Sequence, residues 1–216
     1  MNKDHIESNY NQIFRFFIFI SCIYGTTDYC LPKEVVDLQK TLYGSKYIYL
    51  TNICLYLTVL CLIMGYMVRY KEMSFIKNIY KHSITVMLPL NGLVSILFWV
   101  LYSIDPTLLR DKDLYCQGVR ISLFTDLCVH LFPFLSLINE IRGLKITRHR
   151  SHLKFYVYFT ILYYIVCLYF SKLNGIWVYP IMGKINTFYR VFLFGVSTLI
   201  ALGLYEAMIH ILINKS

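Results

Sequence analysis

Long runs of apolar residues separated by short polar stretches are the dominant pattern along this chain. Two of the runs, 49–68 and 84–104, contain no charged residue over their whole length. A helix that crosses the hydrocarbon core of a bilayer needs about 20 mostly apolar residues, so each run is long enough to span a membrane. The pattern therefore predicts an all-α, polytopic transmembrane helical bundle.

Four further runs complete the prediction of about six spans. Segments 121–139 and 191–213 are long enough, and each contains one acidic residue and one histidine. Segment 155–171 is slightly short but uncharged. The expected spans are 13–29, 49–68, 84–104, 121–139, 155–171 and 191–213, in a single membrane domain over residues 1–216.

The first of these segments is the least regular, because Arg15 and Asp28 shorten its apolar part. The residues before it do not form a positively charged leader, and no small-x-small cleavage site follows it. We therefore interpret it as a retained helix and not as a signal peptide. A bundle of five spans is the alternative.

Composition supports the same class of protein. Of the 216 residues 57% are hydrophobic and only 15% are charged, whereas soluble domains carry about 25% charged residues. So little charge cannot cover the surface of a soluble globule of this length. A soluble enzyme, a disordered protein and a small disulfide scaffold are all disfavoured.

The formal net charge of +9 reflects basic residues in the loops. Segments 69–83 and 140–154 hold nine of them, which favours a cytosolic location for these loops and for both termini. Basic residues that flank apolar helices are expected to meet anionic lipid headgroups, and no nucleic-acid-binding motif is present. Membrane lipids are therefore the expected partners, and nucleic acid is not.

The seven cysteines form no C-x-x-C pair, which disfavours a metal or thioredoxin-type site. Cys30 and Cys116 fall in loops that six spans would place on the same non-cytosolic side. They could form a disulfide there, and two free thiols are the alternative.

Ionisable residues within a membrane helix are costly to bury, so each is a candidate functional group. His130 and Asp126 are four residues apart on one helix face, where the carboxylate could orient the imidazole. A buried hydrogen bond that merely holds helices together is the alternative. Glu206 and His210 have the same spacing near the end of the last span, where a structural role is favoured.

Several strings of residues, in one order along the chain, resemble the androgen-induced protein family of polytopic membrane proteins. The strings are Tyr43-Gly44-Ser45-Lys46-Tyr47, Tyr49-Leu50-Thr51, Pro89, Phe98-Trp99-Val100-Leu101-Tyr102-Ser103-Ile104-Asp105, His130-Leu131-Phe132-Pro133-Phe134 with Glu140, Gly175-Ile176-Trp177-Val178-Tyr179-Pro180 and Arg190-Val191-Phe192-Leu193-Phe194-Gly195. Together they cover about residues 43–205.

The resemblance implies an activity: hydrolysis of fatty acid esters of hydroxy fatty acids by a membrane threonine and a histidine. These roles fall on Thr51 and His130. Without the resemblance, Thr51 would be read as an ordinary helix threonine bonded to a carbonyl one turn back. Leu131 stands where the family tends to have a small polar residue, and Asp126 where an asparagine-like residue is expected, so the resemblance does not support a charged triad.

The chemistry is physically reasonable, because a neutral imidazole can remove the proton that makes a hydroxyl a poor nucleophile. Counting residues from the span ends leaves Thr51 and His130 about 6–10 Å apart in depth, a gap that helix tilt and side-chain reach would have to close. Spans two and four start from the same face, so both residues lie in the same half of the bilayer.

Other residues near that face are candidates for supporting the reaction or lining a substrate site. They are Asn52, Asp126, Trp99, Tyr102, Asp105, Trp177, Tyr179 and Pro180. Asn52 or a backbone N–H near Thr51 could stabilise the oxyanion, while an aromatic belt is the ordinary explanation for the tryptophans and tyrosines.

The leading hypothesis is an intramembrane hydrolase of lipid carboxylic esters, without cofactor or metal, in an endomembrane such as the endoplasmic reticulum or in the plasma membrane. A non-catalytic protein that binds lipid or scaffolds partners is the main rival. A bundle that conducts protons or solutes through Asp126, His130, Glu206 and His210 is a weaker one.

Overall fold

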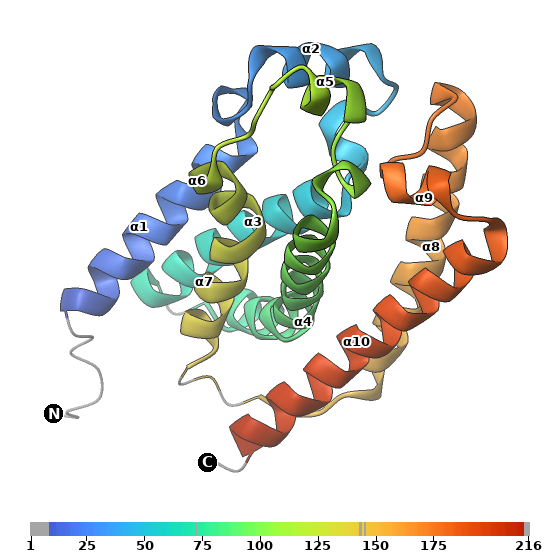
Figure 1. The fold of residues 1–216 in the computed structure, drawn as a ribbon. Helices are drawn as coiled ribbons and strands as arrows, with labels where there is room; N and C mark the ends of the chain where they lie inside the picture. The colour runs from blue at the N-terminus through green and yellow to red at the C-terminus, as the bar shows by residue number, and fades with distance from the viewer. Residues whose placement is uncertain (1–8, 72, 143, 145, 214–216) are drawn as a thin grey trace, which may run out of the picture.

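The computed structural model describes residues 9–71, 73–142, 144 and 146–213, which fold into helices joined by loops, with no strand among them (Figure 1). The long helices are α1 (Asn9–Thr26), α3 (Leu50–Tyr70), α4 (Ser74–Ile104), α7 (Phe132–Ile141), α8 (Arg150–Asn174) and α10 (Thr187–Ile213). The short ones are η1 (Asp28–Cys30), α2 (Lys33–Thr41), η2 (Ser45–Ile48), η3 (Pro106–Leu108), α5 (Lys112–Cys116), α6 (Leu123–Asp126), η4 (Leu127–Leu131) and α9 (Pro180–Lys184).

Within the described residues, five helices are long and apolar enough to cross a membrane: Leu50–Tyr70, Ser74–Ile104, Leu123–Ile141, Arg150–Asn174 and Thr187–Leu212. The third combines α6, η4 and α7 into one helix. This finding confirms the polytopic helical bundle and agrees with the alternative of five spans. The expectation of six fails at α1, which opens with polar residues and is interrupted by Arg15, so its apolar part is shorter than a span requires.

Helix α1 nevertheless packs along the bundle, against α3 and α7. In Figure 1 it rises from the left side of the molecule, above the level at which α10 finishes, towards the upper end, where α2 and α5 lie. Its outer face exposes large apolar side chains, including Ile13 and Phe16 at 67% and 62%. A continuous apolar face of this kind is typical of a surface that contacts lipid.

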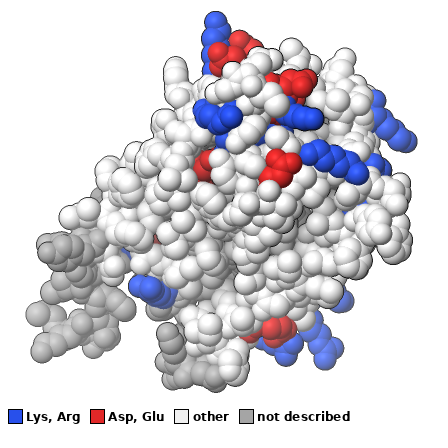
Figure 2. Space-filling model, in the orientation of Figure 1, with Lys and Arg blue, Asp and Glu red and all other residues white. Residues whose placement is uncertain are grey.

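Charged side chains gather at the two ends of the molecule. Figure 2 shows most of the visible Lys, Arg, Asp and Glu atoms near the top and bottom, with a largely uncharged band between them. The upper end consists of the loops and short helices over residues 27–49, 105–122 and 175–186. This distribution is expected where the middle of the bundle lies in hydrocarbon.

Helix α4 forms the centre of the bundle, in contact with α3, α7 and α10. In the most apolar 18-residue stretch of α4, 67% is buried, compared with 17% in the corresponding stretch of α8. Pro89 lies inside α4 and has no N–H, so the carbonyl of Thr85 lacks its usual helix partner. The Tyr156 hydroxyl, from α8, donates to the carbonyls of Thr85 at 3.4 Å and Val86 at 3.1 Å and satisfies this break.

A buried carboxylate joins four helices near the lower end. Glu140 of α7, 4% exposed, lies 3.0 Å from Arg15 Nε of α1 and 2.7 Å from Arg69 Nη2 of α3, and it accepts a hydrogen bond from the Tyr80 hydroxyl of α4. Gly65 makes room for it, because a Cβ there would lie 2.8 Å from Glu140 Oε2. The carboxylate neutralises the arginine that α1 carries into the bundle.

We predict that Glu140→Gln strongly destabilises the fold, since it leaves buried arginine charge without a counter-ion. Breaking a buried ion pair from one side costs about 3–5 kcal/mol, so thermal unfolding in detergent or nanodiscs should shift markedly downward. Glu206→Gln is the matched control, because Glu206 pairs with Arg148 at 2.6 Å on the surface. An exposed pair contributes about 0–1 kcal/mol. Equal shifts for the two variants would contradict this account.

Candidate functional site

A cavity of about 240 Å³ lies among the helices, and both Thr51 and His130 line it. Its walls are mainly apolar side chains of α4, α8 and α10. On α4 the lining runs from Leu90 to Leu101, which corresponds to a depth of about 16 Å along the helix. The two basic side chains of the lining, Lys46 and Arg110, and the Asn52 amide come from the upper-end loops and the first turn of α3, so this end of the cavity is the more polar one.

Thr51 is the second residue of α3, and a tight turn before this helix positions it. Gly44 adopts φ +80°, and a Cβ there would lie 2.3 Å from the side chain of Ile48, so the turn requires glycine. The Asn174 side chain, at the end of α8, accepts from the Tyr43 N–H at 2.8 Å and donates to the Tyr43 carbonyl at 3.1 Å. The turn is therefore attached to α8.

Two tyrosines hold the first residue of α3. The Leu50 N–H donates to the hydroxyl oxygens of Tyr163 at 2.7 Å and Tyr179 at 3.0 Å, and the Tyr163 hydroxyl donates to the Ile48 carbonyl at 3.0 Å. Burial raises the pKa of Tyr179, while hydrogen bonding with Tyr163 and with the Thr51 side chain opposes the rise. The Thr51 hydroxyl is thus within reach of a tyrosine hydroxyl that remains neutral.

The position of Tyr163 explains how Thr51 and His130 come to line one cavity. Tyr163 lies eleven residues before the end of α8, or about 16 Å along that helix. Because its hydroxyl bonds to Ile48 and Leu50, α3 begins well inside the bundle and not at its rim. This inward placement of residues 45–50 puts Thr51 deeper than counting residues from the span end suggests, which reduces the expected difference in depth from His130.

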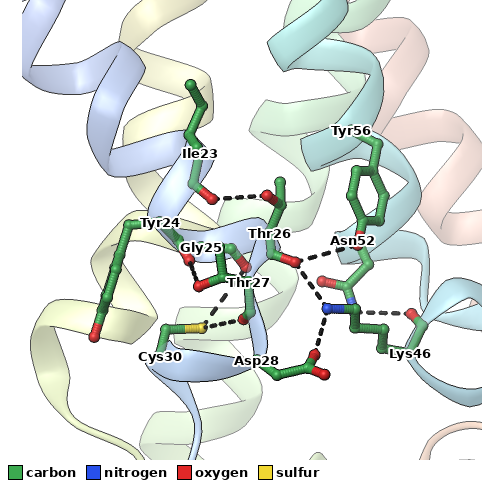
Figure 3. Close-up of polar contacts among 10 residues, drawn as sticks. All are labelled: Ile23, Tyr24, Gly25, Thr26, Thr27, Asp28, Cys30, Lys46, Asn52 and Tyr56. Carbon is green, nitrogen blue, oxygen red and sulfur yellow. Dashed lines mark hydrogen bonds and ion pairs between the residues drawn. The ribbon is translucent and has the colours of Figure 1, made fainter.

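Lys46 links the same turn to the end of α1, as Figure 3 shows. Its ammonium donates to the Thr26 carbonyl at 2.8 Å and to Asp28 Oδ1 at 2.5 Å. The hydrogen bond from Lys46 lowers the pKa of Asp28. Burial alone would lower the pKa of Lys46, but the bond to Asp28 raises it overall. The Asn52 amide, a candidate oxyanion donor, donates to the Lys46 carbonyl at 2.8 Å, so one of its two N–H hydrogens is already used.

His130 lies in a π-helical turn, η4, in the middle of its span. Such turns are uncommon and occur frequently at functional sites. Pro133 follows within one turn and cannot donate to the carbonyl four residues before it, which weakens the regular helix at this point. The imidazole lies flat on the Phe98 ring, with centroids 3.4 Å apart and planes 9° apart. Its orientation is therefore set by α4.

The hydrogen bonds of His130 determine which ring nitrogen can act as a base. Nδ1 lies 3.0 Å from the backbone carbonyl of Asp126, which can only accept. A neutral imidazole that donates through Nδ1 has its lone pair on Nε2, and this is the tautomer that a general base needs.

The carboxylate of Asp126 does not orient His130 as the spacing suggested. Its nearest oxygen is 4.0 Å from His130 Nδ1, while its other oxygen accepts from Arg110 Nη2 at 2.5 Å. In the π-helical turn, the imidazole makes its hydrogen bond with the backbone carbonyl of Asp126 instead. A charged His–Asp relay is therefore absent, in line with the departure from the family pattern at this position.

Of the residues expected at the site, five line the cavity: Thr51, Asn52, Asp126, His130 and Tyr179. Trp99 and Tyr102 lie outside the lining. Their rings pack on Phe98, at 5.1 and 5.4 Å between centroids, so they support the ring on which His130 rests.

The remaining three expected residues also lie outside the lining and have structural roles. Asp105 accepts from the N–H and hydroxyl of Thr107 and caps η3. Trp177 packs under the guanidinium of Arg190 at 4.1 Å, and Pro180 begins α9. The family strings that contain these three residues therefore form loops and short helices of the upper end, around the cavity.

Cys30 and Cys116 are both free thiols in this structure, Cys30 buried and Cys116 exposed. The Cys30 thiol instead contacts the Thr27 carbonyl at 3.1 Å. Glu206 pairs with Arg148, which supports the structural interpretation of that acid.

Arg110, Lys46 and Tyr163 are cavity-lining residues that the sequence did not single out. Arg110 and Lys46 looked like ordinary loop bases that set topology, and Tyr163 is one of 20 tyrosines. The run containing Lys46 belonged to a family string, which was the available signal for it. No pattern indicated Arg110 or Tyr163, because their partners lie 16 and about 115 residues away.

Five helices that are apolar and long enough to cross a membrane define a multi-pass integral membrane protein. The chain belongs to the FAR-17a/AIG1-like protein family, whose family model matches residues 12–212. It is similar to a UPF0641 membrane protein of Schizosaccharomyces pombe, with 24% identity over 173 residues that cover 78% of this chain and 76% of that protein. No solved structure matches it significantly. The family match confirms the resemblance inferred from the motifs.

We predict that Tyr163→Phe loosens the start of α3. The variant loses the bond to the Ile48 carbonyl and one acceptor for the Leu50 N–H, which should destabilise the protein by about 1–2 kcal/mol. Amide exchange at residues 48–52, measured by mass spectrometry, should accelerate. Tyr169→Phe on the same helix is the control, because that side chain is 59% exposed. Unchanged exchange in Tyr163→Phe would show that the tyrosine does not hold the turn.

Proposed function

We propose that this protein is an intramembrane hydrolase of lipid carboxylic esters, with Thr51 as the nucleophile and His130 as the general base. The observation that carries the proposal is that both residues line one cavity, where the bond from Nδ1 to the Asp126 carbonyl leaves Nε2 as the acceptor. Acyl transfer of this kind needs a hydroxyl as the nucleophile and a neutral imidazole that can take its proton.

The reaction proceeds through an acyl-enzyme. Thr51 Oγ1 attacks the ester carbonyl while His130 Nε2 takes the hydroxyl proton. The tetrahedral intermediate collapses, the C–O bond to the alcohol breaks, and the imidazolium returns the proton to the leaving alcohol. Water, deprotonated by the same imidazole, then attacks the acyl-threonine. The bond from the acyl carbon to Thr51 Oγ1 breaks, the imidazolium returns the proton to Oγ1, and the fatty acid is released.

The shape of the cavity favours a lipid ester over a small polar one. Its deeper walls are apolar side chains of α4, α8 and α10, such as Leu93, Phe159 and Leu193. Apolar pockets with a few converging polar groups are typical of sites that bind small molecules. The acyl chain would lie against these walls, with the ester beside Thr51 at the polar end.

The test is covalent labelling with a fluorophosphonate probe in nanodiscs. The wild type should be labelled, and Thr51→Ala and His130→Ala should lose labelling and hydrolysis by about 10²–10⁴-fold, because each removes a group that reacts. Thr51→Ser should retain labelling.

Two substitutions serve as matched controls. Thr58→Ala removes another buried threonine of α3, outside the cavity lining, whose hydroxyl donates to the Cys54 carbonyl and accepts from the Asn91 amide. His210→Ala removes an exposed histidine of α10. Both should be labelled like the wild type, and a Thr51→Ala protein that is labelled at full strength would rule out the threonine mechanism and leave lipid binding without catalysis.

A further inference from the structure

The hydroxyl of Thr51 has an unusual partner for a threonine in a membrane helix. Thr58, Thr85 and Thr198 each donate to the carbonyl four residues before, at 2.7–2.9 Å, which is the ordinary arrangement. Within the described part of the chain Thr51 makes no such bond, and its side chain instead meets the hydroxyl of Tyr179, which lines the same cavity. The proposed nucleophile and this phenol therefore share one part of the cavity wall.

The Tyr179 hydroxyl has a hydrogen that it can offer to a ligand. Its oxygen accepts from the Leu50 N–H at 3.0 Å, and no carbonyl among the described residues accepts its hydrogen. The oxygens within its reach belong to the hydroxyls of Tyr163 and Thr51, and a phenol hydrogen can rotate from them to a ligand. Tyr163 differs, because its own hydrogen is used by the Ile48 carbonyl at 3.0 Å.

The position of the Tyr179 phenol is fixed before any ester binds. Pro180 follows Tyr179 and restricts its backbone to the extended region, where it lies at φ −119° and ψ 133°. The Met182 N–H donates to the Tyr179 carbonyl at 2.9 Å, and the ring packs edge-on against Tyr49 at 5.6 Å between centroids. A donor held in this way loses little freedom when charge develops beside it, which is what stabilises a transition state.

We propose that Tyr179 is a catalytic residue whose phenol hydrogen binds the oxyanion that forms when Thr51 attacks the ester carbonyl. This inference deepens the proposed function and rests on it. As Thr51 Oγ1 bonds to the carbonyl carbon, an electron pair of the C=O bond moves onto the oxygen, and the hydrogen bond from Tyr179 strengthens without transfer of its proton. Collapse returns the pair to the C=O bond and expels the alcohol. Attack of water on the acyl-threonine forms a second oxyanion at the same carbonyl, so the same donor serves both steps.

Hydrolysis of 4-methylumbelliferyl palmitate by the full chain in nanodiscs tests this role. Tyr179→Phe should lower kcat about 10²–10³-fold, the usual effect of losing one oxyanion donor, and leave KM nearly unchanged. Tyr163→Phe is the matched comparison, because it also removes an acceptor of the Leu50 N–H and loses the bond to the Ile48 carbonyl as well. It should lower kcat by less than about tenfold, since it removes structural bonds alone. Equal falls in the two variants would show that Tyr179 only holds α3 and would overturn the proposal.

Inhibition by two lipid analogues separates stabilisation of charge from the shape of the cavity. A palmityl trifluoromethyl ketone accepts Thr51 Oγ1 at its carbonyl, while His130 takes the proton, and forms an oxyanion that mimics the intermediate. Tyr179→Phe should weaken inhibition by this ketone by the same factor as kcat/KM, because transition-state analogues depend on the same interactions. Inhibition by a dialkyl ether of equal length, which forms no oxyanion, should be unchanged. An equal loss of affinity for the ether would indicate a disturbed cavity and contradict the proposal.

Thr51→Ala distinguishes failure of this inference from failure of the proposed function. If Thr51→Ala abolishes hydrolysis while Tyr179→Phe remains fully active, the function stands and the role of Tyr179 is wrong. A fall in kcat with Asn52→Ala but not with Tyr179→Phe would assign the oxyanion to the amide and also reject the role. Hydrolysis that persists in Thr51→Ala would reject the proposed function, and the role of Tyr179 with it.

Discussion

The hydrogen bonds that two tyrosines make with the start of α3 determine the rest of the site. Through them the Leu50 N–H and the Ile48 carbonyl are satisfied by Tyr163 and Tyr179 inside the bundle and not by water at its rim. Free backbone groups cannot remain unpaired at this depth, so the helix can begin there only because these hydroxyls complete its first turn. Thr51 reaches the cavity for that reason.

Polar groups in this bundle fall into two sets with different physical roles. Near the lower end, Glu140 pairs with two arginines, accepts a hydrogen bond from a tyrosine and joins α1, α3, α4 and α7, so both of its oxygens are in use. Near the upper end, polar groups line a cavity and retain spare capacity: the lone pair of His130 Nε2, and Arg110 Nη1, which has no hydrogen-bond partner within the described part of the chain. Saturated buried networks hold structure, whereas unsaturated groups at a cavity wall are available to a ligand.

Much of this architecture follows from the sequence, since apolar runs long enough to cross a bilayer predict five of the helices directly. The same rule predicts α1 as a sixth span, although Arg15 interrupts its apolar part. Arg15 pairs with an acid 125 residues away, and no local pattern reveals this pairing. Only the family strings point to Thr51, because a threonine in a membrane helix has no local feature that distinguishes it, whereas His130 is already a candidate as an ionisable residue in an apolar run. The tautomer of His130 could not be predicted from the sequence. It depends on a π-helical turn in which Nδ1 of the imidazole lies against the backbone carbonyl of Asp126 and not against its carboxylate.

The central claim is that Thr51 forms a covalent acyl intermediate in a cavity where His130 is the base. The most direct measurement is mass-spectrometric mapping of the protein after rapid quenching with a lipid ester labelled in its acyl chain. The account predicts a label on the peptide that contains Thr51 and its accumulation in a variant that acylates but cannot complete deacylation. Turnover of the ester with the label on a different residue, or with no acylated peptide in a quench fast enough to trap it, would contradict the account.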